Sequence, residues 1–152
     1  MATTLDDAKL TIRVTEEVTL NGRELGNTNK HEITGINEVS ERIVTIPTNQ
    51  VTILSASSNV GAGTFLSSSI KYIRLTNLDD TNFVRVTFAS GSAETSNTAD
   101  FKLGAQRTMM FTSTAFSGSS TNVDFSSFND FTNLKCIADS DSVDVELFVA
   151  TT

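Results

Sequence analysis

The chain has 152 residues, of which 38% are hydrophobic, and it carries a formal net charge of −7. A chain of this length can bury a core of its own, which favours a single domain. Its lysines and arginines are dispersed, so no basic stripe can displace the counterions of a phosphate backbone, and we expect no nucleic-acid partner. No stretch approaches the roughly 18 apolar residues of a membrane span, so we expect no membrane partner either.

The first residues of the chain are polar. Residues 1–8 lack a positively charged stretch followed by an apolar one, so they do not have the pattern of a signal peptide. We expect them to form an extended N-terminal arm on a protein that is made in a cytoplasm. No linker or repeat divides residues 9–152, which are predicted to form a single β-sandwich domain.

A long strand and a tight turn are predicted next. Residues 9–20 are rich in Thr and Val, and the dipeptide Asn21-Gly22 that follows favours a tight turn because both residue types tolerate positive φ. Residues 23–25 are expected to return as a short partner strand, before a polar loop over residues 26–30.

The rest of the chain alternates between strand-like runs and turn-like runs. Strands are predicted over 41–46 and 50–55, split by Pro47 and the two residues after it. The predicted strand pairs are 70–76 with 83–89 around the turn 78–82, 99–103 with 107–112, and 134–138 with 142–151. Polar loops are predicted over 57–69, 90–98 and 115–122. The three-residue spacing of Phe125, Phe128 and Phe131 favours a helical turn, in which core packing is preferred to a sticky surface patch.

The apolar residues of these runs tend to recur at every second position. In Val143–Val149, valine and leucine alternate with mostly polar residues, which is the pattern of a strand with one buried face and one wetter face. A sheet with one apolar face has to cover it with a second layer. The sequence therefore predicts an all-β fold: an antiparallel, jelly-roll-like β-sandwich with about 8–10 strands and one short helical turn.

Side chains with catalytic chemistry are scarce. The chain holds one His, one Cys and no Trp, whereas 41 residues are Ser or Thr. His31 has no serine or cysteine motif near it, and Gly61-Ala62-Gly63 lacks the Lys-Ser/Thr of a phosphate-binding loop. Cys136 lies in an apolar run and is predicted to be a buried, inert thiol. We expect no enzyme, no catalytic residues and no cofactor.

Two carboxylate groups remain as candidates. Asp139, Asp141 and Asp144 could hold a hard cation such as Ca²⁺, although the run lacks the glycine and the distant glutamate of a helix–loop–helix calcium loop. Asp and Ser also make turns by bonding their own backbone, and we favour a turn here. Asp79-Asp80 could do acid–base work, but the pair sits in a predicted hairpin turn, where it would be solvated.

Three phrases within residues 70–150 resemble virion proteins of tailed bacteriophages, especially those of marine and cyanobacterial phages. They are the hairpin Lys71–Val84, the turn and strand Phe101–Phe111, and the closing hairpin Leu134–Leu147. The relatives usually carry a glycine late in the middle turn, where this chain has Gln106 and places its glycine at Gly104. These are packing and turn motifs, and the resemblance supplies no catalytic, cofactor-binding or metal-binding residues.

This resemblance implies a virion structural protein. We expect a capsid decoration or cement protein that stabilises the head shell as a homo-oligomer, with a trimer favoured, and that contacts the major capsid protein or other virion proteins. A tail, neck or baseplate component is one alternative. A carbohydrate-binding module for host attachment is another, although sugar platforms favour Trp and Tyr and this chain has only Tyr72.

Overall fold

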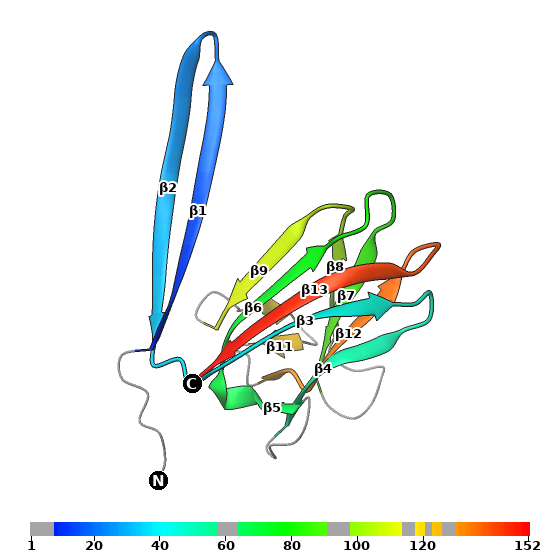
Figure 1. The fold of residues 1–152 in the computed structure, drawn as a ribbon. Helices are drawn as coiled ribbons and strands as arrows, with labels where there is room; N and C mark the ends of the chain where they lie inside the picture. The colour runs from blue at the N-terminus through cyan, green and yellow to red at the C-terminus, as the bar shows by residue number, and fades with distance from the viewer. Residues whose placement is uncertain (1–7, 58–63, 91–97, 114–117, 121–122, 126–129) are drawn as a thin grey trace. The chain divides into compact units, whose positions relative to one another are not determined.

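The computed structural model describes residues 8–57, 64–90, 98–113, 118–120, 123–125 and 130–152. The contacts divide the chain into two compact units, residues 1–37 and residues 38–152. Strands dominate both units (Figure 1). Among the described residues, one helical element has defined bounds, the 3-10 turn η1 (Ser67–Ser69). No helix in the described residues is long and apolar enough to cross a membrane.

The first unit is a regular β-hairpin. Strand β1 (Lys9–Leu20) pairs antiparallel with β2 (Arg23–Thr34) in one unbroken register over 12 residues each. Asn21 and Gly22 have φ angles of 51° and 75°. Positive φ at both central residues is what a two-residue turn needs to match the twist of its strands, so the predicted tight turn is confirmed.

The hairpin is longer than its sequence predicts. Residues 26–30, expected to be a loop, are part of β2, and residues 9–34 form a two-stranded sheet of their own. The polar residues of this stretch are solvent-exposed, so the strand has no apolar alternation to reveal it. The sandwich expected to begin at residue 9 begins at Glu38, whereas residues 1–7 of the expected arm lie outside the described chain.

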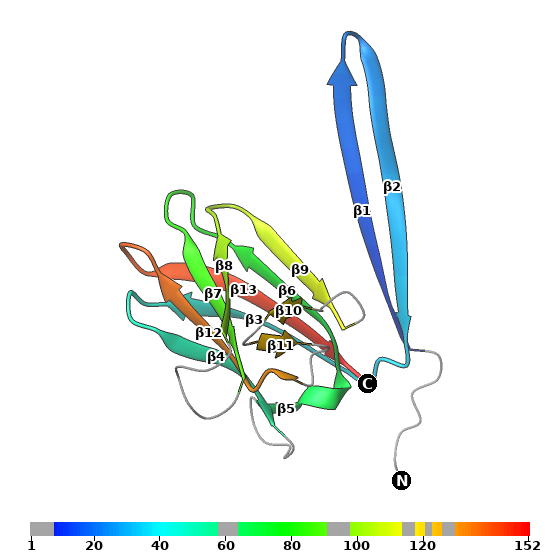
Figure 2. The same ribbon diagram turned by 180° about the vertical axis from the view of Figure 1, so that it is seen from behind.

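The second unit contains two sheets, which Figures 1 and 2 show from opposite sides. The four-stranded sheet has the order β3 (Glu38–Ile46), β13 (Val143–Thr151), β6 (Ile70–Asn77), β9 (Thr108–Thr112). The five-stranded sheet has the order β5 (Thr64–Leu66), β4 (Val51–Ser57), β12 (Asn133–Ala138), β7 (Val84–Ala89), β8 (Thr98–Leu103). Neighbouring strands are antiparallel except for β4 and β5, and a small hairpin is made by β10 (Gly118–Ser120) and β11 (Val123–Phe125).

The strands of the sandwich pair in a nested order. β3 pairs with β13, β4 with β12, β6 with β9, and β7 with β8. The outermost strands in sequence therefore join each other, and each following pair lies inside the previous one. This is the winding of a jelly roll, in which one long folded ribbon makes both sheets. The predicted all-β, antiparallel sandwich is confirmed.

The strands of the three predicted hairpins in this unit lie in different sheets, so these hairpin predictions are wrong. β6 and β7, β8 and β9, and β12 and β13 do not pair with each other, although each pair was expected to form a hairpin. The turns between them instead carry the chain from one sheet to the other. Each of these strands therefore bonds to a strand that is distant in sequence, whereas the strand next to it in sequence lies in the opposite layer of the sandwich.

The core lies between the two sheets. Its fully buried side chains include aliphatic residues from β3, β4, β6, β7, β8, β12 and β13 and the aromatic residues Phe88 and Phe131. The ring of Phe88 meets those of Phe101, Phe111 and Phe131 edge-on, with centroids 5.1–6.0 Å apart. Phe131 is thus a core residue, as predicted. Phe125 lies in β11 and Phe128 lies outside the described residues, so the helical turn expected there is replaced at its start by a strand.

Candidate functional site

The two faces of the β1–β2 hairpin differ in chemistry. Residues directly opposite each other in an antiparallel pair share a face, as do residues two apart in one strand. The register therefore gathers on one face every large aliphatic residue of the hairpin: Leu10, Ile12, Val14, Val18, Leu20, Leu25 and Ile33. Val18, Leu20 and Leu25 are 55%, 57% and 53% exposed. A lone two-stranded hairpin is at best marginally stable in water, so this apolar face is a candidate interaction surface.

The opposite, polar face of the hairpin has an uneven charge distribution. Near its open end lie Lys9, Arg13 and Lys30 with Glu32, and near the turn lie only acids, Glu17 and Glu24. Glu32 Oε1 forms ion pairs with Lys30 Nζ, 2.6 Å away, and with Lys9 Nζ, 3.5 Å away. These bonds, above all the one from Lys30, lower the pKa of Glu32. The open half of the face is therefore basic and the turn half is acidic.

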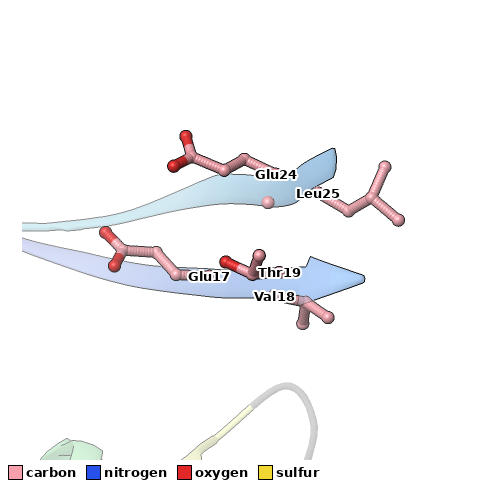
Figure 3. Close-up of a pocket in the computed structure, with 6 residues that line it drawn as sticks. Glu17, Val18, Thr19, Glu24 and Leu25 are labelled. Carbon is pink, nitrogen blue, oxygen red and sulfur yellow. The ribbon is translucent and has the colours of Figure 1, made fainter. Parts of the chain in front are cut away.

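A hollow of about 320 Å³ lies against the turn half of the hairpin, lined by Glu17, Val18, Thr19, Glu24, Leu25 and Gly26. Figure 3 shows the carboxylates of Glu17 and Glu24 turned to the same side. A Cβ built on Gly26 would lie 2.4 Å from the carbonyl oxygen of Glu16, so only glycine fits there. Because its lining side chains are exposed and come from a single hairpin, the hollow cannot enclose a small ligand as a binding pocket does.

The outer face of the four-stranded sheet carries a second cluster, centred on Arg74 of β6. The Nη2 atom of Arg74 lies 2.7 Å from Glu146 Oε2 and 3.3 Å from Glu41 Oε1. Its guanidinium stacks on the ring of Phe148, 5.4 Å from the centroid, and that ring meets Tyr72 edge-on at 5.8 Å. Burial raises the pKa of the Tyr72 hydroxyl. The cluster is therefore a packed unit of arginine, aromatics and carboxylates on the outside of the sandwich.

The Arg74 cluster has exposed aliphatic neighbours. The register places Val39, Ile43 and Met110 on the same outer face, with exposed fractions of 52%, 64% and 46%. The Nε of Arg74 is buried without a hydrogen-bond partner. Arg, aromatic residues and Met are enriched at the centres of protein interfaces. This face is thus a second candidate surface, smaller in exposed apolar content than the hairpin.

Asp79 of the predicted carboxylate pair organises a turn. Its Oδ1 accepts the backbone N–H groups of Asn82 at 2.5 Å and Thr81 at 2.8 Å. These bonds, that from Asn82 first, lower the pKa of Asp79. The neighbouring Asp80 Oδ1 accepts the Thr81 hydroxyl at 2.9 Å. Both side chains therefore cap the loop between β6 and β7.

The three carboxylates considered for a cation do not come together as ligands. Asp144 Oδ1 accepts the hydroxyl of Thr45 at 2.6 Å on β3, whereas Asp141 accepts the N–H of Ser142 at 2.7 Å. Within the described residues, no group of three His, Cys, Asp or Glu side chains is placed to hold a metal ion. Asp139 lies in the turn before β13, so the arrangement is that of a turn.

The remaining sequence candidates are separate from one another. His31 is exposed on β2 opposite Ile12. Cys136 is fully buried in β12, and this burial raises the pKa of its thiol to about 12, as expected for an inert core cysteine. Gly61-Ala62-Gly63 lies outside the described residues.

Sequence reasoning missed both candidate interaction surfaces. The apolar face of the hairpin had a signal, since the aliphatic residues of 9–20 all occupy even positions. The contribution of Leu25 and Ile33 depends on the register of β2, and this register could not be predicted because residues 26–30 were expected to form a loop. The Arg74 cluster joins residues from three strands that are distant in sequence, and no local pattern reveals such a meeting.

Comparisons with known proteins find little. No protein family model matches this chain, and no curated protein sequence matches it. A solved structure titled "Bacillus endospore appendages form a novel family of disulfide-linked pili" aligns over 100% of this chain and 96% of its own, with 11% sequence identity and a TM-score of 0.47. A likeness of this degree does not establish a shared fold or a shared function.

Proposed function

We propose that this chain is a structural protein of a bacteriophage particle, most specifically a capsid decoration or cement protein that acts through contacts between its own copies and with the major capsid protein. The observation that carries the proposal is the amphipathic β1–β2 hairpin. Its large aliphatic residues are gathered on one face, and four of the seven, Val14, Val18, Leu20 and Leu25, are exposed. A face of this kind marks a surface that another protein covers.

The charge distribution supports a structural partner over a nucleic acid. Within β1 and β2, four bases (Lys9, Arg13, Arg23, Lys30) balance four acids (Glu16, Glu17, Glu24, Glu32). Residues 38–152 hold twelve acids and seven bases. Sandwiches of neighbouring copies repel one another, whereas the neutral hairpin can approach a protein surface without that cost. The reason for assigning the chain to a bacteriophage particle is the resemblance of residues 70–150 to phage virion proteins.

The proposal is tested on the particle. Mass spectrometry of purified particles should detect the chain in many copies, and a cryo-electron microscopy reconstruction should place it on the head shell with its hairpin against a neighbour. Density for this chain in the tail, neck or baseplate would contradict the decoration role but would still agree with a structural role in the virion. Absence of the chain from purified particles would refute the proposal.

A further inference from the structure

The outer edge of β1 is long, regular and unprotected. β1 runs for 12 residues without a register shift, contains no proline, and belongs to a two-stranded sheet. In the described part of the chain, no strand pairs with the edge of β1 that faces away from β2. Proteins usually blunt such edges with bulges, prolines or short strands, because free N–H and C=O groups recruit further strands. The edge of β1 is thus suited to pair with a strand.

The alternation of backbone groups determines which residues can form that pair. In a hairpin with a two-residue turn, the pair that flanks the turn, here Leu20 and Arg23, exchanges both hydrogen bonds. Every second residue before Leu20 then bonds to β2 as well. The residues between them, Thr11, Arg13, Thr15, Glu17 and Thr19, direct their N–H and C=O groups to the free edge. A partner strand must therefore pair with these odd-numbered positions.

The sequence of β1 is complementary to itself about one of these positions. An antiparallel pair of β1 strands with its twofold axis at Thr15 sets Arg13 opposite Glu17 of the second copy, twice. The same register sets Ile12 opposite Val18, Leu10 opposite Leu20, and Thr11 opposite Thr19, and it leaves one mismatch, Val14 opposite Glu16. Opposite charges, aliphatic pairs and Thr–Thr pairs are each favourable across strands. Among the described residues, neither Arg13 nor Glu17 forms an ion pair, so both charges are available.

β2 lacks this property. An antiparallel pair of β2 strands centred on Thr28 would set Glu24 opposite Glu32. One centred on Asn27 would set Arg23 opposite His31 and Glu24 opposite Lys30, but Lys30 already pairs with Glu32 at 2.6 Å within its own hairpin. Gly26 also offers no side chain for a cross-strand contact, and glycine weakens a strand interior. The charge pattern therefore selects β1 as the edge that meets a copy of itself.

We propose that two copies of this chain join through their β1 strands, antiparallel about Thr15, to form a four-stranded sheet with the order β2-β1-β1-β2. The inference rests on the proposed homo-oligomeric function and specifies its contact. Both apolar faces lie on the same side of the joined sheet, since a twofold axis normal to the sheet preserves sides. A four-stranded sheet with an apolar face reaches the size at which sheets become stable. The contact joins copies in pairs and leaves the sandwiches free to form other contacts.

Cysteine cross-linking of the full chain tests the register. In a hydrogen-bonded antiparallel pair the Cα atoms lie about 5.5 Å apart, within reach of a disulfide. Thr15→Cys should therefore give disulfide-linked dimers under mild oxidation that a reductant reverses. Thr28→Cys is the matched control: the Thr28 hydroxyl lies 3.1 Å from that of Thr15 in the same hairpin. In the joined sheet the two β2 strands are outermost, about 14 Å apart, so this variant should stay monomeric on a non-reducing gel.

A mixture of two variants tests the direction of the strands. Thr11→Cys and Thr19→Cys should cross-link when mixed, whereas each alone should not. Parallel pairing would instead link Thr11→Cys to itself, which would overturn the proposal. Native Cys136 is fully buried and does not compete in these reactions.

Charge reversal provides a measurement that does not depend on disulfide geometry. Arg13→Glu and Glu17→Arg should each weaken self-association about tenfold by sedimentation equilibrium, since each converts two favourable pairs to like charges. The double variant Arg13→Glu/Glu17→Arg should restore the wild-type constant. A double variant as weak as the single ones, or Thr15→Cys linking no better than Thr28→Cys, would overturn the proposal.

The two proposals fail in distinguishable ways. An oligomer that forms without a Thr15→Cys link contradicts the β1 contact and leaves the virion role standing. A chain that links through Thr15→Cys but is absent from particles contradicts the virion role and leaves the β1 contact standing. A chain that stays monomeric at all concentrations contradicts the β1 contact.

Discussion

The side-chain amide of Asn77 donates a hydrogen bond to the backbone carbonyl of Leu103, 3.3 Å away, and another to the carbonyl of Asn82 at 2.9 Å. Its oxygen accepts the N–H of Asp79 at 2.9 Å. Asn77 ends β6 in one sheet and Leu103 ends β8 in the other. The amide, which is only 1% exposed, therefore ties the crossing loop to both layers of the sandwich.

Replacing this amide should be costly. Asn77→Leu keeps a similar volume but leaves two carbonyls and one N–H without their partner, so we expect the free energy of unfolding to fall by about 2–4 kcal/mol in urea titrations. Thr76→Ala, one residue earlier, removes only a hydroxyl that contacts Thr108 at 3.1 Å near the surface. That control should cost less than about 1 kcal/mol. Equal losses for the two variants would contradict this role for Asn77.

The Asp79 turn should give the stability a dependence on pH. Its pKa is lower in the folded chain than in the unfolded chain, so its contribution is complete above the unfolded value of about 3.9 and is lost as the pH falls through the lowered folded value. We expect Asp79→Asn to unfold more easily than wild type at neutral pH, with a difference that shrinks in acid. Leu78→Ala, next to it and 49% exposed, should show a difference independent of pH. Chemical denaturation at several pH values measures both.

The ion pair between Arg74 and Glu146 should be measurable by a double-mutant cycle. Their side chains are 30% and 27% exposed, and the contacting atoms lie 2.7 Å apart. With Arg74→Met and Glu146→Gln we expect a coupling free energy of about 1 kcal/mol that falls in high salt. The cycle with Glu41→Gln is the control, since Glu41 is more exposed and lies at 3.3 Å. Its coupling should be smaller, and the reverse order would contradict the geometry.

Cys136 should be chemically silent in the folded protein. Full burial and a thiol pKa of about 12 leave almost no thiolate in mildly alkaline buffer. A disulfide reagent with a chromogenic leaving group should therefore not react with the native chain, but should titrate one thiol in denaturant. The variant Thr28→Cys, exposed on β2, is the control and should show one additional reactive thiol without denaturant. Rapid reaction of the native wild-type chain would contradict the buried position of Cys136.

Local patterns were sufficient to predict most of the long strands of this chain and several of its turns. Alternation identified β13 around Val143–Val149, and the turn preference of Asn21-Gly22 identified the hairpin tip, because both depend on neighbours in sequence. Residues 26–30 were missed since a strand exposed on both faces has no apolar alternation. The turn at 78–82 was also identified, although its role was not.

The pairing of strands could not be predicted in this way. A turn that folds a strand back onto its neighbour and a turn that crosses to the opposite sheet use the same Asp, Asn and Thr residues. The loop 78–82 crosses between sheets, and the Asn77 amide that helps to hold it there bonds Leu103, a partner 26 residues away. The candidate surfaces were missed for the same reason: the cluster around Arg74 exists only once Glu41 and Phe148 have been brought beside it by pairing.

The nested winding also decides when the protein can fold. Thr45 and Asp144 are sheet partners, so the first strand of the sandwich has no neighbour until the last strand has left the ribosome. Contacts this distant in sequence make folding slow, since a large loop must close before they form. A nascent chain arrested before Val143 would leave β3 and one side of β6 without their sheet partner β13, and it would be a substrate for chaperones and proteases.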